Sequence, residues 1–325
     1  MTGAANWPKY AVVNLARATT IATGAGFCRR HATTGSMRAT HLLSGCANGA
    51  TSALRLATGG VLLLAAFGVG APVSAAETTT LTASYTISIA GVTVGRADVR
   101  SRFTDNGYAA AINGSTYGIS RMVSDARAVL AGSGKISGAR VAPVSYNLET
   151  SESGFETHVS MSMRGGSVVG LDAVPSLIEA ADRVPLTARH KNNILDPVGA
   201  FVVALDRPGE PDGRRVCNRT VKVFDGWQRF DIRLAYRETK AVNGSYSGDV
   251  IVCSARYVPI AGHRPSRESV EYMANNKRLE IWMVPIDGTR LLVPYRILIG
   301  TKIGDLVIGA RQFETTRTEQ QASTN

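Results

Sequence analysis

The chain has 325 residues, of which 44% are apolar and 19% are charged. This composition excludes a disordered chain, and the length excludes a small scaffold held together by disulfides alone. The 36 lysines and arginines outnumber the 25 acidic residues. Much of the excess lies at the N-terminus and the remainder is mild, so the charge does not indicate a nucleic-acid-binding protein.

Residues 1–76 have the features of an export signal. They contain no acidic residue and carry six lysines and arginines. An apolar run at Val61–Val69 is followed by small residues that suit signal-peptide cleavage, either before Ala76 or before Glu77. The run is shorter than the roughly 20 residues of a membrane-spanning helix. We therefore expect export with cleavage near Ala75 or Ala76, and no transmembrane anchor after cleavage.

The predicted leader is longer than the roughly 15–30 residues of most signal peptides. A start at Met37 would give a more usual length, so we predict that translation begins there and not at Met1. Cys46 ends a sequence that resembles a lipoprotein cleavage box. The box precedes the apolar run instead of following it, so we do not expect a lipid on Cys46.

Two cysteines remain after the leader, Cys217 and Cys253. Cysteine pairs in an oxidising compartment are usually bridged, and both residues lie in runs with the composition of β-strands. We therefore predict a disulfide between neighbouring strands. The alternative is a metal-binding or redox pair, but the two residues lack the CxxC spacing and a nearby cluster of histidines.

From Leu81 onward the chain alternates between apolar and polar residues, which is typical of strands with one buried face. Similar runs recur as far as Phe313, separated by turn signals such as Asp225-Gly226 and Asn243-Gly244. The pattern predicts one mainly β (α+β) domain over residues 77–313, built as a curved antiparallel sheet or a partly closed β-barrel. The polar tail, residues 314–325, is predicted to be disordered.

One helix is well marked within this domain. Asp196 is a suitable N-cap and Pro197 suits the first helical position. Apolar residues follow with helical spacing at Val198, Phe201, Val202 and Leu205. The sequence therefore predicts a helix over Asp196–Asp206 that packs on the sheet. A second, uncapped helix is a candidate at Ser176–Ala181, and Glu268 and Glu271 would share one face of a helix over Ser266–Asn275.

Several short motifs occur in a fixed order along the mature chain. They are Tyr85-x-Ile87, Gly91 and Gly95, Pro143 with Tyr146, Asp196-Pro197, Val223-x-Asp225-Gly226, Cys253 with Pro259 and Gly262, Ile281-Trp282, and Val293-Pro294-x-Arg296-Ile297. In this order the chain resembles an exported bacterial family, domain of unknown function 3108 (DUF3108), over about residues 81–313. The resemblance implies a β-rich protein of the Gram-negative envelope with no settled activity, and it supplies no catalytic residues to carry over. Together with the predicted export signal, we expect a location in the periplasm.

The sequence contains no recognisable catalytic or metal-binding constellation. The mature histidines, His158, His190 and His263, lack the spacings of zinc sites, and no GxSxG motif is present. We therefore predict no catalytic residue, no metal and no cofactor.

Four aromatic residues in the second half of the chain are the candidate ligand-binding residues. They are Trp227, Phe230, Tyr236 and Trp282. Their ordinary role would be packing in the core. The alternative is that their rings line an apolar groove on the curved sheet, which would hold an acyl chain or a glycan.

Three functions are open at this point. The first is a non-enzymatic periplasmic carrier for a lipid or another envelope component, which should contain a continuous apolar cavity. The second is a structural or assembly factor that contacts a partner protein through a sheet edge or a basic face, with a filled core. The third is a hydrolase of envelope polymers that uses His263. The partner is unknown in each case, and no nucleic acid is expected.

Overall fold

The computed structural model describes residues 76–122, 124–177, 180–207, 209 and 211–320. The predicted leader, residues 1–76, lies almost entirely outside these residues. The same holds for the predicted start at Met37. None of the helices in the described part of the chain is long and apolar enough to span a membrane.

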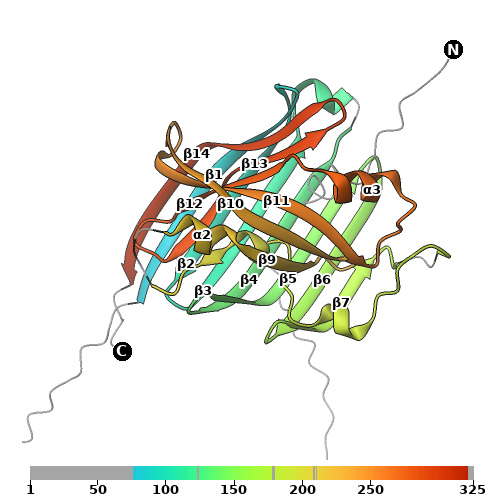
Figure 1. The fold of residues 1–325 in the computed structure, drawn as a ribbon, viewed down its shortest axis with the longest axis horizontal. Helices are drawn as coiled ribbons and strands as arrows, with labels where there is room; N and C mark the ends of the chain where they lie inside the picture. Colours follow the sequence, from blue (N-terminus) through green and yellow to red (C-terminus); the bar gives the residue numbers. More distant parts are fainter. Residues whose placement is uncertain (1–75, 123, 178–179, 208, 210, 321–325) are drawn as a thin grey trace, which may run out of the picture. The chain divides into compact units, whose positions relative to one another are not determined.

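The first half of the chain forms a run of antiparallel strands, each paired with the next (Figure 1). They are β1 (Ala76–Ile89), β2 (Val92–Thr104), β3 (Gly107–Thr116), β4 (Arg127–Ser137), β5 (Arg140–Glu152), β6 (Phe155–Arg164) and β7 (Ser167–Val174). The short 3-10 helix η1 (Gly118–Met122) connects β3 to β4. The predicted alternation is confirmed in β1, where Leu81, Ala83 and Tyr85 are buried.

The second half begins with an irregular stretch and then returns to strands. The stretch contains the 3-10 helices η2 (Ala188–Lys191) and η3 (Gly199–Phe201) and the two-residue strand β8 (Val203–Ala204). The remaining elements are α2 (Gly213–Cys217), β9 (Arg219–Phe224), β10 (Arg229–Asn243), β11 (Ser247–Ala261), α3 (Glu268–Asn275), β12 (Leu279–Pro285), β13 (Leu291–Thr301) and β14 (Gly304–Gln320).

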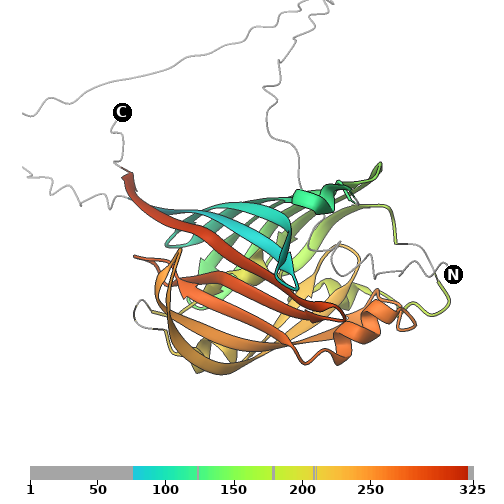
Figure 2. The ribbon, with the colours of Figure 1, turned by 90° about the horizontal axis from the view of Figure 1, so that it is seen from above.

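All strands belong to one 14-stranded antiparallel sheet, which is not closed. Its order is β7-β6-β5-β4-β3-β2-β1-β14-β13-β12-β11-β10-β9, and β8 pairs with β13 beside this path. The last strand therefore pairs with the first, which joins the two halves of the chain. Figure 2 shows the sheet coiled so that the strands of the first half form one layer and β9 to β13 form the other. The predicted curved, mainly β architecture is confirmed.

The free edges at β7 and β9 are bridged by the strap, which we define as residues 180–195. Its C-terminal end pairs with β9 through two hydrogen bonds. Leu195 N donates to the carbonyl of Lys222 at 2.7 Å, and the carbonyl of Leu195 accepts from Phe224 N at 3.0 Å. Ile194 N donates to the carbonyl of Gly166, in the turn between β6 and β7, at 2.9 Å. Two backbone hydrogen bonds link Val184 to Gly262 and His263 near the end of β11. The strap thus connects the two edges at these points without becoming a strand of the sheet.

The space between the two layers is filled with side chains. Tyr146, Phe103, Leu81, Met161 and Phe224 are all less than 2% exposed. A smaller apolar cluster lies under α2, where Val216 packs with Ile251 of β11 and Met283 of β12. Burial of this cluster against a five-residue helix requires an additional constraint, because so short a helix is not stable alone.

That constraint is the disulfide between Cys217 and Cys253, whose Cα atoms are 5.4 Å apart. The predicted disulfide is confirmed, but the expectation that it joins two strands is wrong. Cys217 is the last residue of α2, which Asp212 caps by accepting a hydrogen bond from Arg214 N at 2.9 Å. The bridge therefore fastens a helix to β11.

The predicted helix over Asp196–Asp206 is also wrong. Residues 199–201 form only a 3-10 turn, after which Val203 and Ala204 pair with Leu292 and Leu291 of β13. Gly199 lowers the helical propensity, and strand pairing of a β-branched residue replaces the remaining helical hydrogen bonds. The described residues of the candidate helix Ser176–Ala181 are likewise not helical.

Two further predictions concern the C-terminal tail and the helix that contains Glu268 and Glu271. The prediction of a disordered tail is wrong for residues 314–320, because β14 continues through them and pairs with the start of β1. These threonine-rich segments favour β-structure on pairing. The helix containing Glu268 and Glu271 is confirmed as α3.

Candidate functional site

The four candidate aromatic residues do not surround one groove. Trp227 lies in the β9–β10 turn and donates from Nε1 to the carbonyl of Pro175 at 2.8 Å, which adds a contact across the seam between β7 and β9. Phe230 stacks with Tyr257 on the neighbouring strand β11, with ring centroids 5.3 Å apart. These two rings therefore have structural neighbours in separate places, and their role in ligand binding stays a prediction.

Tyr236 and Trp282 lie in two further environments. Tyr236 packs under α2, where an added Cβ on Gly213 would be 2.2 Å from its ring. Trp282 is flanked by two cations, with Lys240 Nζ 3.9 Å and Arg296 Cζ 4.8 Å from the ring centroid. Cation–π contacts of this kind stabilise each partner by about 1 kcal/mol. Trp282 therefore has charged neighbours at its ring, and the role of Tyr236 and Trp282 in ligand binding stays a prediction.

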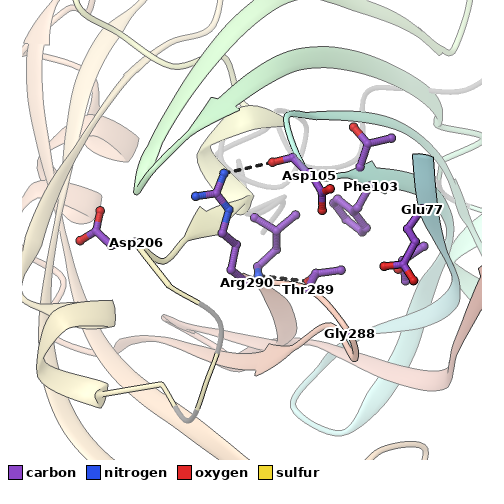
Figure 3. Close-up of a pocket in the computed structure, with 10 residues that line it drawn as sticks. Glu77, Phe103, Asp105, Asp206, Gly288, Thr289 and Arg290 are labelled. Carbon is purple, nitrogen blue, oxygen red and sulfur yellow. Dashed lines mark hydrogen bonds between the residues drawn. The ribbon is translucent and has the colours of Figure 1, made fainter. Parts of the chain in front are cut away.

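A hollow of about 290 Å³ lies at the end of the sheet where β1 begins and the β2–β3 and β12–β13 turns meet. Figure 3 shows Arg290 between Asp206 on one side and Asp105 and Phe103 on the other. Its lining residues are Glu77, Thr79, Phe103, Thr104, Asp105, Asp206, Gly288, Thr289, Arg290 and Leu291. The hollow is slightly smaller than the roughly 300–1,000 Å³ of most ligand sites.

The charged groups around this hollow mostly hold the turns together. Arg290 Nη2 donates to the backbone carbonyl of Asp105 at 3.0 Å. Asp206 Oδ1 accepts from Ala139 N at 3.1 Å, and Glu77 forms an ion pair with Arg317. Since carboxylates predominate, the rim suits a small polar or cationic molecule better than an acyl chain. Sequence reasoning missed these residues because they come from separate turns and share no local motif.

The histidines remain apart from one another. His158 Nε2 lies 3.0 Å from Asp172 Oδ2 on the exposed face of β6 and β7, whereas His190 belongs to η2. His263 is buried, and this burial lowers the pKa of its imidazole. Among the described residues no group of three or more metal-ligating side chains comes together.

A buried carboxylate is the most unusual polar group of the interior. Asp196 has 0% of its surface exposed. Its Oδ1 accepts from Val198 N at 2.8 Å and from Gly199 N at 3.0 Å, which fixes the turn into η3. Its Oδ2 faces the hydroxyl of Tyr108, and neither atom has a hydrogen bond of ordinary geometry. Burial raises the pKa of Asp196 to about 6 and also raises that of Tyr108.

Gly199 is required beside this pair. A Cβ at residue 199 would lie 2.5 Å from Tyr108 Oη and 2.7 Å from Asp196 Oδ2. We expect Gly199→Ala to lower the free energy of unfolding by about 1–3 kcal/mol, the usual cost of overpacking a core. Denaturant unfolding measures this, with Gly170→Ala as control, because a Cβ there would meet Ser162 at an ordinary 3.6 Å. Equal stability of the two variants would contradict the conclusion that residue 199 has no room for a side chain.

The edge strand β7 is the other feature with functional chemistry. Among the described residues it pairs with β6 alone, and its pairing contains a bulge at Val169. Asp172 is its one charged residue, and the side chains of Val169 and Val174 are exposed. Edge strands usually carry charges, prolines or a covering element that prevent pairing with other chains.

The chain is similar to a solved structure and to a protein family. A solved structure, the β-barrel-like protein of domain of unknown function DUF1849 from Brucella abortus, has 8% sequence identity and a TM-score of 0.40. That likeness covers 74% of this chain and 98% of the other. No curated protein matches the sequence. The model of a family described as "Protein of unknown function (DUF3108)" matches residues 84–311. This match covers more than half of the chain, and the protein therefore belongs to the DUF3108 family.

Proposed function

We propose that the protein is an exported, non-enzymatic periplasmic factor that contacts a partner protein through the free edge of β7. The observation that carries this proposal is an edge strand with exposed valines and a single charged residue. Such an edge offers backbone N–H and C=O groups to an extended segment of another protein, which adds itself as a further strand.

The position of the bulge defines the part of β7 that is available. Val169 is the extra residue between the pairs Ser162–Gly170 and Met163–Val168. A bulge twists an edge and interrupts its regular spacing. Residues 170–174 lie beyond it and keep a regular register with β6. The partner segment is therefore expected to pair with this second part of the strand.

The filled interior supports contact with a partner over carriage of a lipid. Tyr146, Phe103 and Phe224 occupy the space between the layers, where an acyl chain would have to lie. The hollow at the end of the sheet where β1 begins has carboxylates at its rim. A carrier would need one continuous apolar space instead.

A pair of matched substitutions tests the edge. Val174 of β7 is 44% exposed and Val144 of β5 is 43% exposed, but β5 is paired on both sides. We expect Val174→Lys to abolish photo-crosslinking of the partner to a probe placed at Asp172, because an added charge blocks edge pairing. Val144→Lys adds the same charge and should leave the crosslink intact. Absence of any crosslink at Asp172, or equal loss in both variants, would overturn the proposal.

The mass of the native protein distinguishes this function from lipid carriage. Protein purified from periplasm without detergent is expected to have the mass of the polypeptide alone. A stoichiometric excess of lipid size would favour the carrier. The same preparation tests export, since its N-terminal sequence should begin at Ala76 or Glu77.

A further inference from the structure

Two hairpin tips with exposed apolar residues lie side by side at the α3 end of the sheet. The first is the β1–β2 tip, with Val92 56% exposed, and the second is the β13–β14 tip, with Ile303 55% exposed. The strands β1 and β14 are neighbours, and Ala90 N donates to the carbonyl of Asp305 at 3.0 Å. Figure 2 shows both tips and α3 at the same end of the molecule.

An exposed aromatic ring extends this group on its other side. Tyr117 follows β3, and its N–H donates to the carbonyl of Val94 in β2 at 2.9 Å. The ring is partly exposed, and Arg96 Cζ lies 3.4 Å from its centroid. Tyrosine with a neighbouring cation is typical of the boundary between a membrane and water, where the ring and the charge contact different layers.

Cations surround the tips. Lys302 adjoins Ile303 and pairs with Glu268, while Arg278 pairs with Asp305 at 2.6 Å. Lys277 and Arg121 are exposed and form no ion pair among the described residues. Glu271 of α3 lies beside the tips, and Asp125 and Glu152 lie next to the chain that follows η1, on the side of Arg121. At the two tips themselves, Lys302, Arg278 and Lys277 accompany Glu268, Glu271 and Asp305, and Arg96 beside Tyr117 adds a fourth cation.

We propose that these two tips form a membrane-docking end that inserts Val92 and Ile303 into the surface of an anionic lipid bilayer. The apolar residues protrude from separate turns, whereas a stable protein interface needs a continuous area of about 800 Å² on each partner. Protruding apolar groups bordered by cations are suited to an interface whose surface is negative and whose interior is apolar. The tips and the β7 edge consist of different residues, so the proposal does not depend on the proposed partner.

Binding of the purified protein to lipid vesicles tests the proposal. We expect co-sedimentation with vesicles of phosphatidylethanolamine and phosphatidylglycerol, and much weaker binding to phosphatidylcholine. The double variant Val92→Asp/Ile303→Asp should bind roughly tenfold or more weakly, since two partly exposed side chains lose their apolar contact. Lys277→Gln should weaken binding about fivefold at low salt and less at high salt. Val144→Asp, on the flank of the sheet, should bind like the unmodified protein.

A fluorescent probe gives a second, independent readout. Tryptophan emission from a Val92→Trp variant should shift to shorter wavelength with anionic vesicles, whereas emission from Val144→Trp should not shift. Thermal unfolding of each variant establishes that the fold is retained, which is expected because both tips are exposed. No binding to anionic vesicles, or equal effects of the substitutions at Val144 and at the tips, would overturn the proposal.

Discussion

Removal of the disulfide by Cys217→Ala/Cys253→Ala is expected to lower the free energy of unfolding by roughly 4 kcal/mol. The two cysteines are 36 residues apart in sequence, and closing a loop of that size restricts the unfolded chain strongly. The native state also loses the bond that fastens α2 over Ile251 and Met283. We therefore expect α2 to detach before the sheet unfolds.

Limited trypsin digestion distinguishes detachment of α2 from global unfolding. Arg214 and Arg215 of α2 are exposed cleavage sites, but a helix held to the sheet resists proteolysis. Reduction of the native protein should accelerate cleavage there, while Arg140 in the β4–β5 hairpin keeps its original rate. Denaturant unfolding measures the global loss. An unchanged midpoint in the double variant would show that the bridge contributes little to stability.

Stability is expected to fall between pH 4 and pH 7 because of Asp196. Its pKa is about 6 in the folded protein and 3.8 in its ordinary state, so the folded protein holds the proton more tightly. The stabilisation from this group is complete below the ordinary value and is lost as the pH rises through about 6. The difference corresponds to about 3 kcal/mol for a carboxyl group with no exposed surface.

Asp196→Asn is expected to remove the part of the pH dependence of stability that this carboxyl group causes. The amide oxygen can still accept from Val198 N and Gly199 N, and the amide nitrogen can donate to the hydroxyl of Tyr108. The variant should match the native protein near pH 4 and exceed its stability near pH 8. Asp225 is the companion site, because burial raises its pKa to about 6 and its Oδ1 accepts from the N–H groups of Trp227 and Gln228.

Unfolding by denaturant at several pH values measures the effect in Asp196→Asn, Asp225→Asn and the double variant. The native protein should show the steepest decline and the double variant the shallowest. Parallel pH profiles for all four proteins would contradict the role of the two carboxylates.

Local sequence patterns were sufficient to predict the strands and most of their turns. The alternation in β1 places Leu81, Ala83 and Tyr85 on one face because successive side chains of a strand point to opposite sides. Asp225-Gly226 was predicted to be a turn from its composition, and Gly226 indeed has φ +105°, which glycine adopts readily. The disulfide was predicted because two cysteines follow the predicted leader and because an oxidising compartment was expected.

The tertiary structure alone decided what becomes of segments whose local preference is weak. Asp196–Asp206 has helical spacing, yet β13 offers a strand partner to Val203 and Ala204, and this pairing overrides the helix. The tail beyond Phe313 is polar, yet β1 supplies a strand that satisfies its backbone.

The functional surfaces were equally beyond the reach of local patterns. Val92 and Ile303 are more than 200 residues apart in sequence and become neighbours because β14 returns to pair with β1. Val174 is an edge residue only because no further strand follows β7 in the sheet of the described residues. The sequence by itself determined which segments form strands and which two cysteines form the disulfide, since these depend on neighbouring residues and composition. Which strands meet, which edge stays free and which tips protrude depend on contacts between distant segments, and those arise only when the whole sheet folds.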